Sequence, residues 1–382
     1  MTLDRGRAFV CPPIGQTLCR PTGVCQTVDT RLACARVTEP RLSVVIVSWN
    51  SVPALRTTLP PLVEELHDGD ELIVADNGSR DGTPGLVAEL APQARIVQMG
   101  ANTGFAAAAN AGAAAASGDL LLLLNPDARP LPGFREAIVR PFVETRGWAA
   151  WMGLVATNEA REVNTAGNPV HFTGLAWAGD HGKPLGAIEP HEVTTLSGAC
   201  LALQLETFHR MGGLPEPFFL YHEDVDLSIR LRLEGETLGI EPAAVVDHEY
   251  EFGGPAKMRW LERNRWALVL RTYPGSLLAL LAPALLLTEL ALIGVSISGG
   301  WGRQKLLADL DALRRLPWAL RTRREIQRRR SISAADFAAL LTPDLDSPYF
   351  GRAGRSRVLR LMLRAYWRVV RMLLGRTRNP PA

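Results

Sequence analysis

Residues 120–127 read Leu-Leu-Leu-Leu-Leu-Asn-Pro-Asp, and this segment is the strongest indication of the architecture. A short continuous apolar run that stops at a turn signal is typical of a strand buried on both faces. Pro126 has no N–H to donate to a neighbouring strand, so the strand should end just before it. Asp127 then lies at the carboxyl end of a central parallel strand, where open α/β sheets bind ligands. For this segment alone, an ordinary turn with a solvated Asp127 is the alternative.

The residues before this strand alternate between strand and helix patterns. Strands are expected at 42–49, 71–75 and 95–99, and helices at 53–66, from 81–84 onward, and in an alanine-rich segment that ends near 117–118. Such alternation predicts a parallel α/β sheet whose functional loops share the carboxyl edge. After it, residues 155–195 show weak periodicity and should form loops and short antiparallel strands. A strand is expected at 196–205, and an acidic segment from Glu223 opens a helix to about Glu234, where Gly235 suits the C-terminal end.

Charge is distributed unevenly along the chain. Residues 271–382 contain 20 Lys and Arg against 7 Asp and Glu, whereas residues 1–270 contain 22 against 32. An acidic body is therefore joined to a strongly basic tail, and this asymmetry suggests a polyanionic partner, either nucleic acid or anionic lipid.

The cysteines do not form a recognisable framework. Four of the five lie at positions 11, 19, 25 and 34, and their gaps of seven, five and eight residues do not match a paired C-x₂-C zinc pattern. Residues 1–40 are interpreted as a flexible leader, with a metal or disulfide knot left open. Cys200 lies in an apolar run and should be a small buried hydrophobe. Since no N-terminal segment has the apolar core of a signal peptide, a reducing cytosolic setting is favoured.

Carboxylates recur at the predicted loops: Asp76, Asp127, and the cluster of Glu223, Asp224 and Asp226. A reaction on a nucleotide diphosphate needs a divalent cation, and hard cations prefer carboxylate oxygens together with substrate phosphates. Asp127 can supply one such ligand. A displacement at a sugar carbon also needs a general base, and a carboxylate at a helix start across the crevice can serve.

Several motifs in order give this pattern a specific resemblance. They are Val-Ser-Trp-Asn (47–50), Asp-Asn-Gly-Ser-x-Asp-Gly-Thr (76–83), Asn-Thr-Gly-Phe-Ala (102–106), Leu-Asn-Pro-Asp-Ala (124–128), Ser-Gly-Ala (197–199) and Phe-Phe-Leu-Tyr-x-Glu-Asp-Val-Asp-Leu (218–227), followed by Lys257 and Arg263-Asn264. Over roughly residues 42–273 the chain resembles an inverting family-2 glycosyltransferase of the rhamnosyltransferase-like branch.

The resemblance implies a GT-A fold and a role for each matching residue. Asp76 would hold the nucleobase, Asp224 with Glu223 would supply the catalytic base, and Asp226 would orient neighbouring groups. The usual metal motif Asp-x-Asp is reduced here to Asn125-Pro126-Asp127, so Asp127 would bind Mg²⁺ or Mn²⁺ with His248 as a second ligand. For His248, a plain structural hydrogen bond is the open alternative. The implied donor-binding residues are Ser48, Trp49, Asn50, Asp76, Asn77, Asn102, Gly104, Phe105 and Asn125. Residues 155–195 would form the acceptor-side wall.

A group of basic residues follows the matching region. They are Lys257, Arg259, Arg263 and Arg265. They are candidates for contacts with the donor diphosphate or a lipid phosphate. A solvated helix face is the alternative for each of them taken singly.

The tail contains two features typical of membrane association. Residues 276–297 are apolar and long enough to span a bilayer, but Glu289 would lie near its middle at high cost. The basic segment that follows should be cytosolic by the positive-inside rule, as must a nucleotide-sugar-binding body, so a re-entrant or in-plane hydrophobic hairpin is expected. A buried helix pair is the alternative.

The second feature is a basic helix. Arginines at 357, 360, 364, 368 and 371 recur every three or four residues and therefore share one helix face, with apolar residues over much of the rest. This pattern is typical of a helix lying in a membrane interface. Nucleic acid is disfavoured as a partner because no interleaved aromatic platform or binding motif accompanies the arginines.

The sequence thus predicts a leader at 1–40, a GT-A glycosyltransferase domain at 41–273, and a hydrophobic and basic helical tail at 274–382. The expected activity is metal-dependent, inverting transfer of a sugar, with rhamnose as the candidate, from a nucleotide-diphosphate donor to a lipid-linked or polysaccharide acceptor. The expected location is the cytoplasmic face of the cell membrane. The alternatives are a nucleotidyltransferase, disfavoured because no Gly- and Lys/Arg-rich phosphate loop is found near the N-terminus, and a non-catalytic nucleotide-sugar-binding membrane scaffold.

Overall fold

The structure, a computed structural model, describes residues 18–19, 25–26, 39–249, 254–347 and 350–376. The chain divides into two compact units, Met1–Glu39 and Pro40–Ala382. In the first unit, strands β1 (Leu18–Cys19) and β2 (Cys25–Gln26) pair antiparallel. Most of the predicted leader, including Cys11 and Cys34, lies outside the described residues. Every other element belongs to the second unit.

A mixed sheet forms the centre of the second unit. Strands β6, β3, β4 and β5 lie in that order and are parallel. Their bounds are β3 (Leu42–Ser48), β4 (Glu71–Asp76), β5 (Arg95–Gln98) and β6 (Leu120–Leu124). The first three differ from the predicted ranges by one residue. The predicted α/β class with a parallel sheet core is therefore confirmed for this half.

The other half of the sheet is built around a strand of reversed direction. Strand β11 (Cys200–Gln204) pairs antiparallel with β6 on one side and with β8 (Trp148–Thr157) on the other. Strand β12 (Thr237–Asp247) runs parallel to β8. The short strands β7 (Arg129–Pro130), β9 (Glu162–Thr165) and β10 (His191–Glu192) extend this half. Consequently the start of β11 and the ends of β8 and β12 reach the sheet edge at which β3, β4 and β6 end.

The predicted strand at 196–205 is shorter than expected. Pairing begins only at Cys200, whose N–H donates to the Ser197 carbonyl at 3.3 Å in a turn. The Ser-Gly-Ala segment at 197–199 is therefore loop. Cys200 itself is a fully buried free thiol, as predicted.

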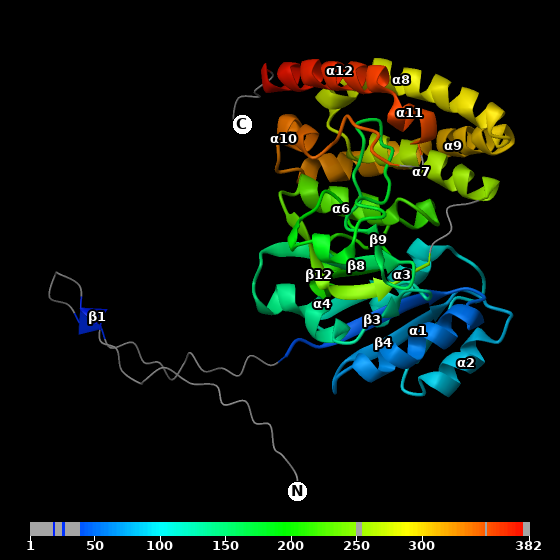
Figure 1. The fold of residues 1–382 in the computed structure, drawn as a ribbon, viewed down its shortest axis with the longest axis vertical. Helices are drawn as coiled ribbons and strands as arrows, with labels where there is room; N and C mark the ends of the chain where they lie inside the picture. Colours follow the sequence, from blue (N-terminus) through cyan, green and yellow to red (C-terminus); the bar gives the residue numbers. More distant parts are fainter. Residues whose placement is uncertain (1–17, 20–24, 27–38, 250–253, 348–349, 377–382) are drawn as a thin grey trace, which may run out of the picture. The chain divides into compact units, whose positions relative to one another are not determined.

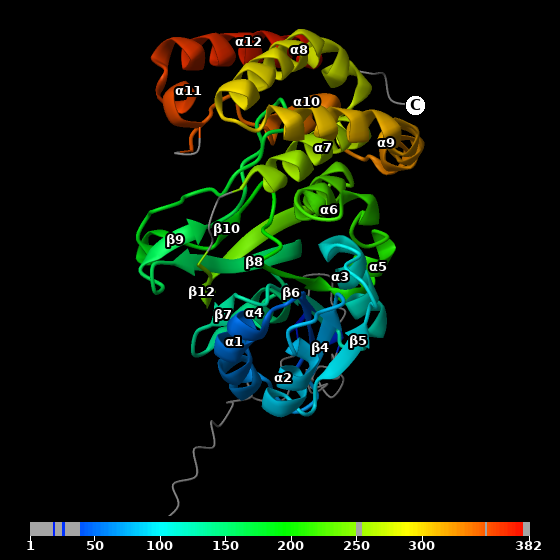
Figure 2. The same cartoon turned by 90° about the vertical axis from the view of Figure 1, so that its right-hand side faces the viewer.

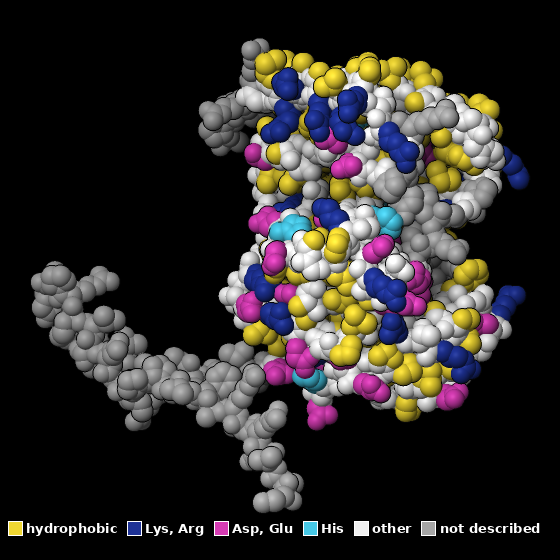
Figure 3. Space-filling model, in the orientation of Figure 1, with side chains coloured by type: hydrophobic (Ala, Val, Ile, Leu, Met, Phe, Trp, Pro, Cys, Tyr) yellow, Lys and Arg dark blue, Asp and Glu magenta, His cyan; other side chains and the backbone are white. Residues whose placement is uncertain are grey.

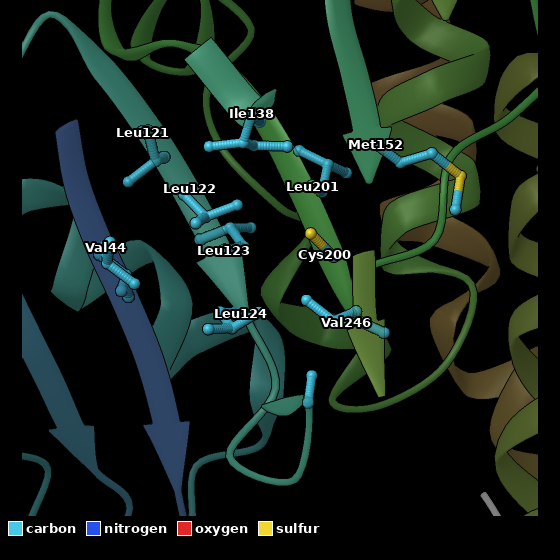
Figure 4. Packing of buried hydrophobic residues seen from close by; sticks show 14 of the residues in the cluster. Val44, Leu121, Leu122, Leu123, Leu124, Ile138, Met152, Cys200, Leu201 and Val246 are labelled. Atoms are coloured by element: carbon cyan, nitrogen blue, oxygen red, sulfur yellow. The ribbon is translucent and has the colours of Figure 1, made fainter. Parts of the chain in front are cut away.

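The leucine run forms the middle of the main core. All five residues of β6 are at most 1% exposed, which confirms a strand buried on both faces. Figure 4 shows Leu121–Leu124 packed among side chains from β3, β11 and the helix α4 (Phe134–Val143). Burying side chains of this size stabilises the fold by about 1.5–3 kcal/mol each.

Helices cover both faces of this sheet. Figures 1 and 2 show α1 (Val52–Glu65), α2 (Thr83–Leu90) and α4 on one face. The helices α3 (Phe105–Ala115) and α6 (Glu223–Leu233) lie on the other, and α5 (Leu205–Arg210) follows β11. Proline in the first turn of α1 and α2 suits a helix start, because its missing N–H would have no helical partner there.

A layer of C-terminal helices covers α6. It contains α7 (Pro255–Thr272), α8 (Gly275–Ser298), α9 (Gly302–Arg329), α10 (Ala334–Ala339), α11 (Gly351–Arg355) and α12 (Arg357–Arg376). Its apolar side chains form a second core with Val225 and Ile229 of α6 and with Phe172. A separate tail domain beginning at residue 274 stays a prediction, and this shared core joins the tail to the body.

The apolar segment at 276–297 is not a hairpin. It forms the single continuous helix α8, because a lone Pro283 removes only one backbone hydrogen bond and no turn follows it. Nor is it a buried helix pair. Leu277, Leu281 and Leu285 are buried, but most other side chains of α8 are exposed. This helix is long and apolar enough to cross a membrane by length and composition, with a mean hydropathy of 2.2.

Glu289 points from α8 into the helical layer. Its carboxylate accepts hydrogen bonds from Arg265 at 2.7 Å and from the Trp266 indole at 3.0 Å, and it pairs with Lys305. These contacts hold α8 along α7 and α9, with its charged residue turned inward. The charge that argued against a membrane span is thus satisfied inside the protein.

Candidate active site

The polar residues after β6 meet the residue after β12 at the sheet edge. The Asn125 N–H donates to the Ala199 carbonyl at 3.0 Å, which fixes the start of the loop. His248 Nε2 lies 3.1 Å from an Asp127 oxygen and 3.4 Å from the Asn125 amide nitrogen. His248 is buried, whereas the Asp127 side chain is 48% exposed. The structure therefore brings the two predicted metal ligands together.

The Asp127–His248 pair fits one divalent cation. Two ligand atoms about 2.1 Å from an octahedral ion and at right angles to one another lie about 3 Å apart, close to the distance observed here. Within the described residues, no group of three or more His, Cys, Asp or Glu side chains could hold a metal ion. A two-ligand site completed by substrate phosphates and water remains compatible with this arrangement, since Mg²⁺ commonly binds in that way. One imidazole nitrogen favours Mn²⁺ over Mg²⁺.

A cavity of about 270 Å³ opens beside this pair. Asn125, His248, Glu223 and Asp224 all contribute to its wall. Adjacent residues of a helix project about 100° apart, yet both Glu223 and Asp224 line this cavity. Both lie in the first residues of α6, directly after His222, whose φ of 67° turns the chain sharply into the helix.

Backbone groups position Asp224. One carboxylate oxygen accepts a hydrogen bond from the Gly198 N–H at 2.8 Å, and the other accepts from the Val225 N–H at 2.7 Å. Burial raises the pKa of Asp224, while these two hydrogen bonds oppose the rise. The carboxylate is thus oriented, partly desolvated and more basic than an exposed Asp, as a general base requires.

Glu223 has a different environment. Burial raises its pKa well above the ordinary value, and the charge of the neighbouring Asp224 raises it further. Among the described residues, none forms a hydrogen bond with Glu223 Oε2. Two adjacent carboxyl groups with different surroundings are suited to different tasks.

Asp226 is absent from the cavity wall. It is fully buried and pairs with Arg230 at 2.7 Å and Arg271 at 2.5 Å. Arg271 belongs to α7, so Asp226 joins the helix of the candidate base to the C-terminal layer.

The loop before α6 is held in an unusual conformation. Phe219, Tyr221 and His222 all have positive φ values, between 65° and 70°, which cost energy for residues with side chains. The Asn264 amide donates to the carbonyls of Phe218, Leu220 and Tyr221 at 2.7–3.0 Å. Arg263 also donates to the Phe218 carbonyl. The Arg263-Asn264 pair of α7 therefore positions the loop that presents Glu223 and Asp224.

Most of the proposed donor-binding residues form a separate polar cluster at the ends of β3 and β4. The Ser48 hydroxyl donates to Asp76 at 3.4 Å, and Asp76 and Asn77 are at most 2% exposed. The Asn50 side chain accepts from the Arg80 N–H at 2.8 Å. Trp49 and Asn50 are the exposed members, with Trp49 at 54%.

The loop before α3 connects that cluster to the cavity. The Asn77 amide donates to the Asn102 side chain and to the Gly104 carbonyl, both at 3.2 Å. Gly104 has a φ of 90°, and a Cβ there would come within 2.5 Å of the Phe219 ring, so no larger residue fits. Of the nine proposed donor-binding residues, Phe105 and Asn125 line the cavity and the other seven do not.

Lys257 lies in the cavity wall, whereas the three arginines predicted with it do not. It is mostly buried, its ammonium lies 4.9 Å from the centre of the Tyr221 ring, and burial lowers its pKa to about 8. Arg259, by contrast, pairs with Asp311, and Arg265 pairs with Glu262 and Glu289. Of the four basic candidates, Lys257 is the one that lines the cavity.

Two aromatic residues of the cavity were missed. Trp177 lies within the predicted acceptor-side wall, and Phe350 belongs to the tail, which was assigned to membrane association alone. No pattern in the tail distinguishes Phe350 from other apolar residues. Trp177 and Phe350 are far apart in the sequence, so only the folded structure reveals that their rings are in contact.

Comparison with known proteins identifies the family. The sequence model of Glycosyl transferase family 2 matches residues 43–210. The N-acetylglucosaminyl-diphospho-decaprenol L-rhamnosyltransferase of Mycobacterium tuberculosis is 30% identical over 231 residues, which cover 54% of this chain and 75% of that protein. This chain belongs to glycosyl transferase family 2. The family match confirms the resemblance read from the motifs and makes the chain a glycosyltransferase, rather than a nucleotidyltransferase or a scaffold.

Further similarities agree with this family-2 assignment. The probable glycosyltransferase YdaM of Bacillus subtilis is 25% identical, over 60% of this chain and 54% of its own. A solved structure of GalNAc-T7 with UDP, GalNAc and Mn²⁺ superposes with a TM-score of 0.52 at 16% identity, covering 64% of this chain and 51% of that one. That likeness concerns the fold alone, which is of the GT-A kind.

Proposed function

We propose that this family-2 glycosyltransferase transfers a sugar from a nucleotide-diphosphate donor to a lipid-linked saccharide with inversion at the sugar carbon. The observation that carries the proposal is the shared cavity of Asp224 and His248, the latter 3.1 Å from Asp127. It combines an oriented base with a candidate cation site at one sheet edge.

Asp224 acts as the general base in this mechanism. It takes the proton of the acceptor hydroxyl while the acceptor oxygen bonds to the sugar carbon, and the bond from that carbon to the diphosphate oxygen breaks. A single in-line displacement of this kind inverts the configuration. Burial raises the pKa of Glu223, and in its protonated form this residue would donate a hydrogen bond to a substrate oxygen.

The donor diphosphate leaves with its charge neutralised by nearby cationic groups. Asp127 and His248 would hold Mn²⁺ or Mg²⁺, which when bound would stabilise the departing diphosphate. Lys257 supplies a further positive charge from the cavity wall. Asp76 would contact the nucleobase, with Ser48, Trp49, Asn50, Asn77, Asn102 and Gly104 shaping the surrounding loops and Phe105 and Asn125 the cavity side.

The relatives support a particular substrate class. The mycobacterial relative is named for transfer of L-rhamnose to a diphospho-decaprenol-linked sugar, and a relative from Myxococcus xanthus, 28% identical, is an O-antigen biosynthesis protein. Rhamnose on a lipid-linked acceptor, within cell-surface glycan synthesis, is accordingly our candidate reaction.

A membrane surface is the proposed setting. Helix α12 has three faces. One is buried and consists of Trp367, Val370 and Leu374, the second carries the arginines, and the third is apolar but exposed. The exposed apolar residues are Val358, Leu361, Met362, Val369, Met372 and Leu373. Figure 3 shows hydrophobic side chains along the upper edge over α8 and α12, with Lys and Arg beneath them. Adjacent apolar and basic faces suit a helix lying in the interface of an anionic bilayer, at the cytoplasmic face of the membrane.

The same reasoning favours an in-plane position for α8. Its exposed residues, Leu286, Leu287 and Leu290 among them, would enter the bilayer interface, while Glu289 stays bound to Arg265 inside the protein. A transmembrane position would break the Glu289–Arg265 ion pair and place the carboxylate in the hydrocarbon of the bilayer.

A thermal-shift screen tests the proposed donor and cation. The intact protein is heated with nucleotide-diphospho-sugars, including nucleotide-diphospho-rhamnose, with and without Mn²⁺. Binding to the folded state raises the midpoint by mass action, so one donor should stabilise the protein more when Mn²⁺ is present. Release of nucleoside diphosphate from that donor then measures turnover. A protein that neither binds nor cleaves any nucleotide-sugar would refute the proposal.

A further inference from the structure

The cavity has an apolar wall that the mechanism does not use. Trp177 and Phe350 meet edge to face, with ring centres 5.1 Å apart and planes at 89°. Leu261 and the alanines beside Trp177 extend this wall, and the amide side chains of Asn164 and Asn168 also line the cavity. Aromatic surface thus occurs together with a few amide groups in the cavity that contains Asp224.

We infer that Trp177 and Phe350 form the binding site for the sugar ring of the acceptor. The inference rests on the proposed function and adds the residues that recognise its second substrate. A pyranose ring has C–H-rich faces and a rim of hydroxyl groups. An aromatic wall suits the face, and amide side chains suit the hydroxyls, as in other sites where apolar surface is combined with few polar groups.

The origin of the wall assigns it to the acceptor rather than to the donor. The proposed nucleotide contacts come from the loops after β3 and β4, and Ser48 and Asp76 are absent from this cavity wall. Trp177 comes from the long connection between β9 and β10, and Phe350 precedes α11. Asp224 must contact the acceptor hydroxyl, so an acceptor ring has to occupy the cavity that Asp224 lines.

Backbone pairing holds the two aromatic segments together. The Phe172 N–H donates to the Thr342 carbonyl at 3.1 Å, and the Thr342 N–H donates to the Val170 carbonyl at 2.9 Å. The Phe172 ring also stacks on Trp367 of α12, with centres 5.0 Å apart and planes at 17°. The tail therefore completes the acceptor site, besides carrying the exposed apolar and basic faces.

Kinetics of the intact protein in detergent micelles test this inference without a bilayer. The acceptor probe is N-acetylglucosaminyl-diphosphate on a short isoprenyl chain, with the donor found by the thermal-shift screen. Phe350→Leu keeps an apolar side chain but removes the ring, and Phe350→Tyr keeps the ring. Phe350→Leu and Trp177→Leu should each raise the acceptor KM about tenfold, with a smaller effect on kcat.

The ring-retaining variant and a distant aromatic provide the controls. Phe350→Tyr should stay within about twofold of wild-type KM, and so should Trp301→Leu, which removes a mostly buried ring at the start of α9, outside the cavity wall. Nucleoside diphosphate affinity, measured by thermal shift, should be the same in all four variants.

Each other outcome overturns the inference. If Phe350→Leu and Trp177→Leu still transfer sugar with an unchanged acceptor KM, the inferred acceptor site is wrong, while the proposed function is unaffected. Equal losses in Phe350→Leu and Phe350→Tyr, or in Trp301→Leu, mean that no aromatic contact with the acceptor is being measured. If the wild-type protein binds no nucleotide-sugar, the proposed function fails and the inference fails with it.

Discussion

Replacing Asp224 with Asn separates catalysis from folding better than any other single change. The substitution keeps the shape of the side chain and removes its ability to accept a proton. A positioned general base contributes about 10²–10⁴-fold, or about 3–5 kcal/mol of transition-state stabilisation. We therefore expect kcat to fall by at least two orders of magnitude in a coupled assay of nucleoside diphosphate release with acceptor present.

The structure also sets the folding cost of this variant. The carboxylate accepts from two N–H groups, Gly198 at 2.8 Å and Val225 at 2.7 Å, and an amide has only one oxygen to offer. One buried N–H loses its partner, at a cost of about 1–3 kcal/mol. That loss lowers the melting temperature by several degrees at most but leaves the protein folded at assay temperature, so it cannot account for a hundredfold loss of kcat.

The pH dependence supplies a second readout. Burial raises the pKa of Asp224, and only its ionised form accepts a proton. Wild-type activity should thus fall as the pH drops through a value above the ordinary Asp range, and Asp224→Asn should lose this acidic limb. The residual activity of the variant should depend little on pH in that range.

Two neighbouring carboxylates serve as matched controls. Asp226→Asn breaks the buried pairs with Arg230 and Arg271, so it should cost about 3–5 kcal/mol of stability while kcat per folded molecule stays near normal. Glu223→Gln preserves a neutral hydrogen-bonding group and should lose at most about tenfold in kcat. If Asp224→Asn turns over normally while Glu223→Gln is inactive, the base has been assigned to the wrong carboxylate. Normal turnover in all three variants would refute the mechanism.

Three further predictions concern the cation, a lysine and α12. Asp127→Ala should weaken donor binding in the presence of Mn²⁺, because it removes the only carboxylate of the proposed metal pair, and calorimetry with and without Mn²⁺ measures the loss. Burial lowers the pKa of Lys257 to about 8, so kcat/KM for the donor should fall as the pH rises through about 8, whereas Lys257→Arg should retain its charge and move this limb to higher pH. Replacing Arg360, Arg368 and Arg371 with Gln should lower partitioning onto vesicles rich in phosphatidylglycerol roughly 100-fold, at about 1 kcal/mol per charge, as measured by flotation.

Each of these predictions has an outcome that contradicts it. If wild type and Asp127→Ala bind the donor equally well with Mn²⁺, Asp127 does not hold the cation. If wild type and Lys257→Arg lose activity at the same alkaline pH, the charge of Lys257 does not contribute to donor binding. For α12, the control replaces three exposed arginines of the body with Gln, namely Arg56, Arg95 and Arg161. Equal loss of flotation in both triple variants would mean that net charge, and not the face of α12, controls binding. Deleting the whole tail is a poorer test, because it would expose the second core.

The sheet could be predicted from the sequence because its determinants are local. The leucine run, the β-branched segment at 42–48 and the turn residues that follow each strand act within a few residues of one another. The motif residues at the strand ends then share one edge as a consequence of parallel pairing. The strand at 196–205 was predicted too long for the same reason, since nothing local distinguishes Ser197 from the paired residues after it.

The tail was harder to predict because its polar contacts join residues far apart in the sequence. Glu289 argued against a membrane span, and the demand that the body and the basic segment both be cytosolic led to the expected hairpin. In the folded chain Arg265 and Lys305, from two other helices, supply its partners, and α8 stays continuous. Charge patterns alone could not reveal this pairing.

The proposed acceptor site also depends on contacts between residues far apart in the sequence, which local patterns do not reveal. Periodicity assigns Trp367 to a basic amphipathic helix, and composition assigns Phe172 to an irregular segment, so neither pattern connects them. Their stacking, and the pairing of Phe172 with Thr342, place the tail against the wall that carries Trp177. A helix that binds lipid on its exposed faces would then support the acceptor site through its buried face. Membrane binding and acceptor recognition should therefore be lost together when the buried face of α12 is disrupted, and separately when only its arginines or only Phe350 are changed.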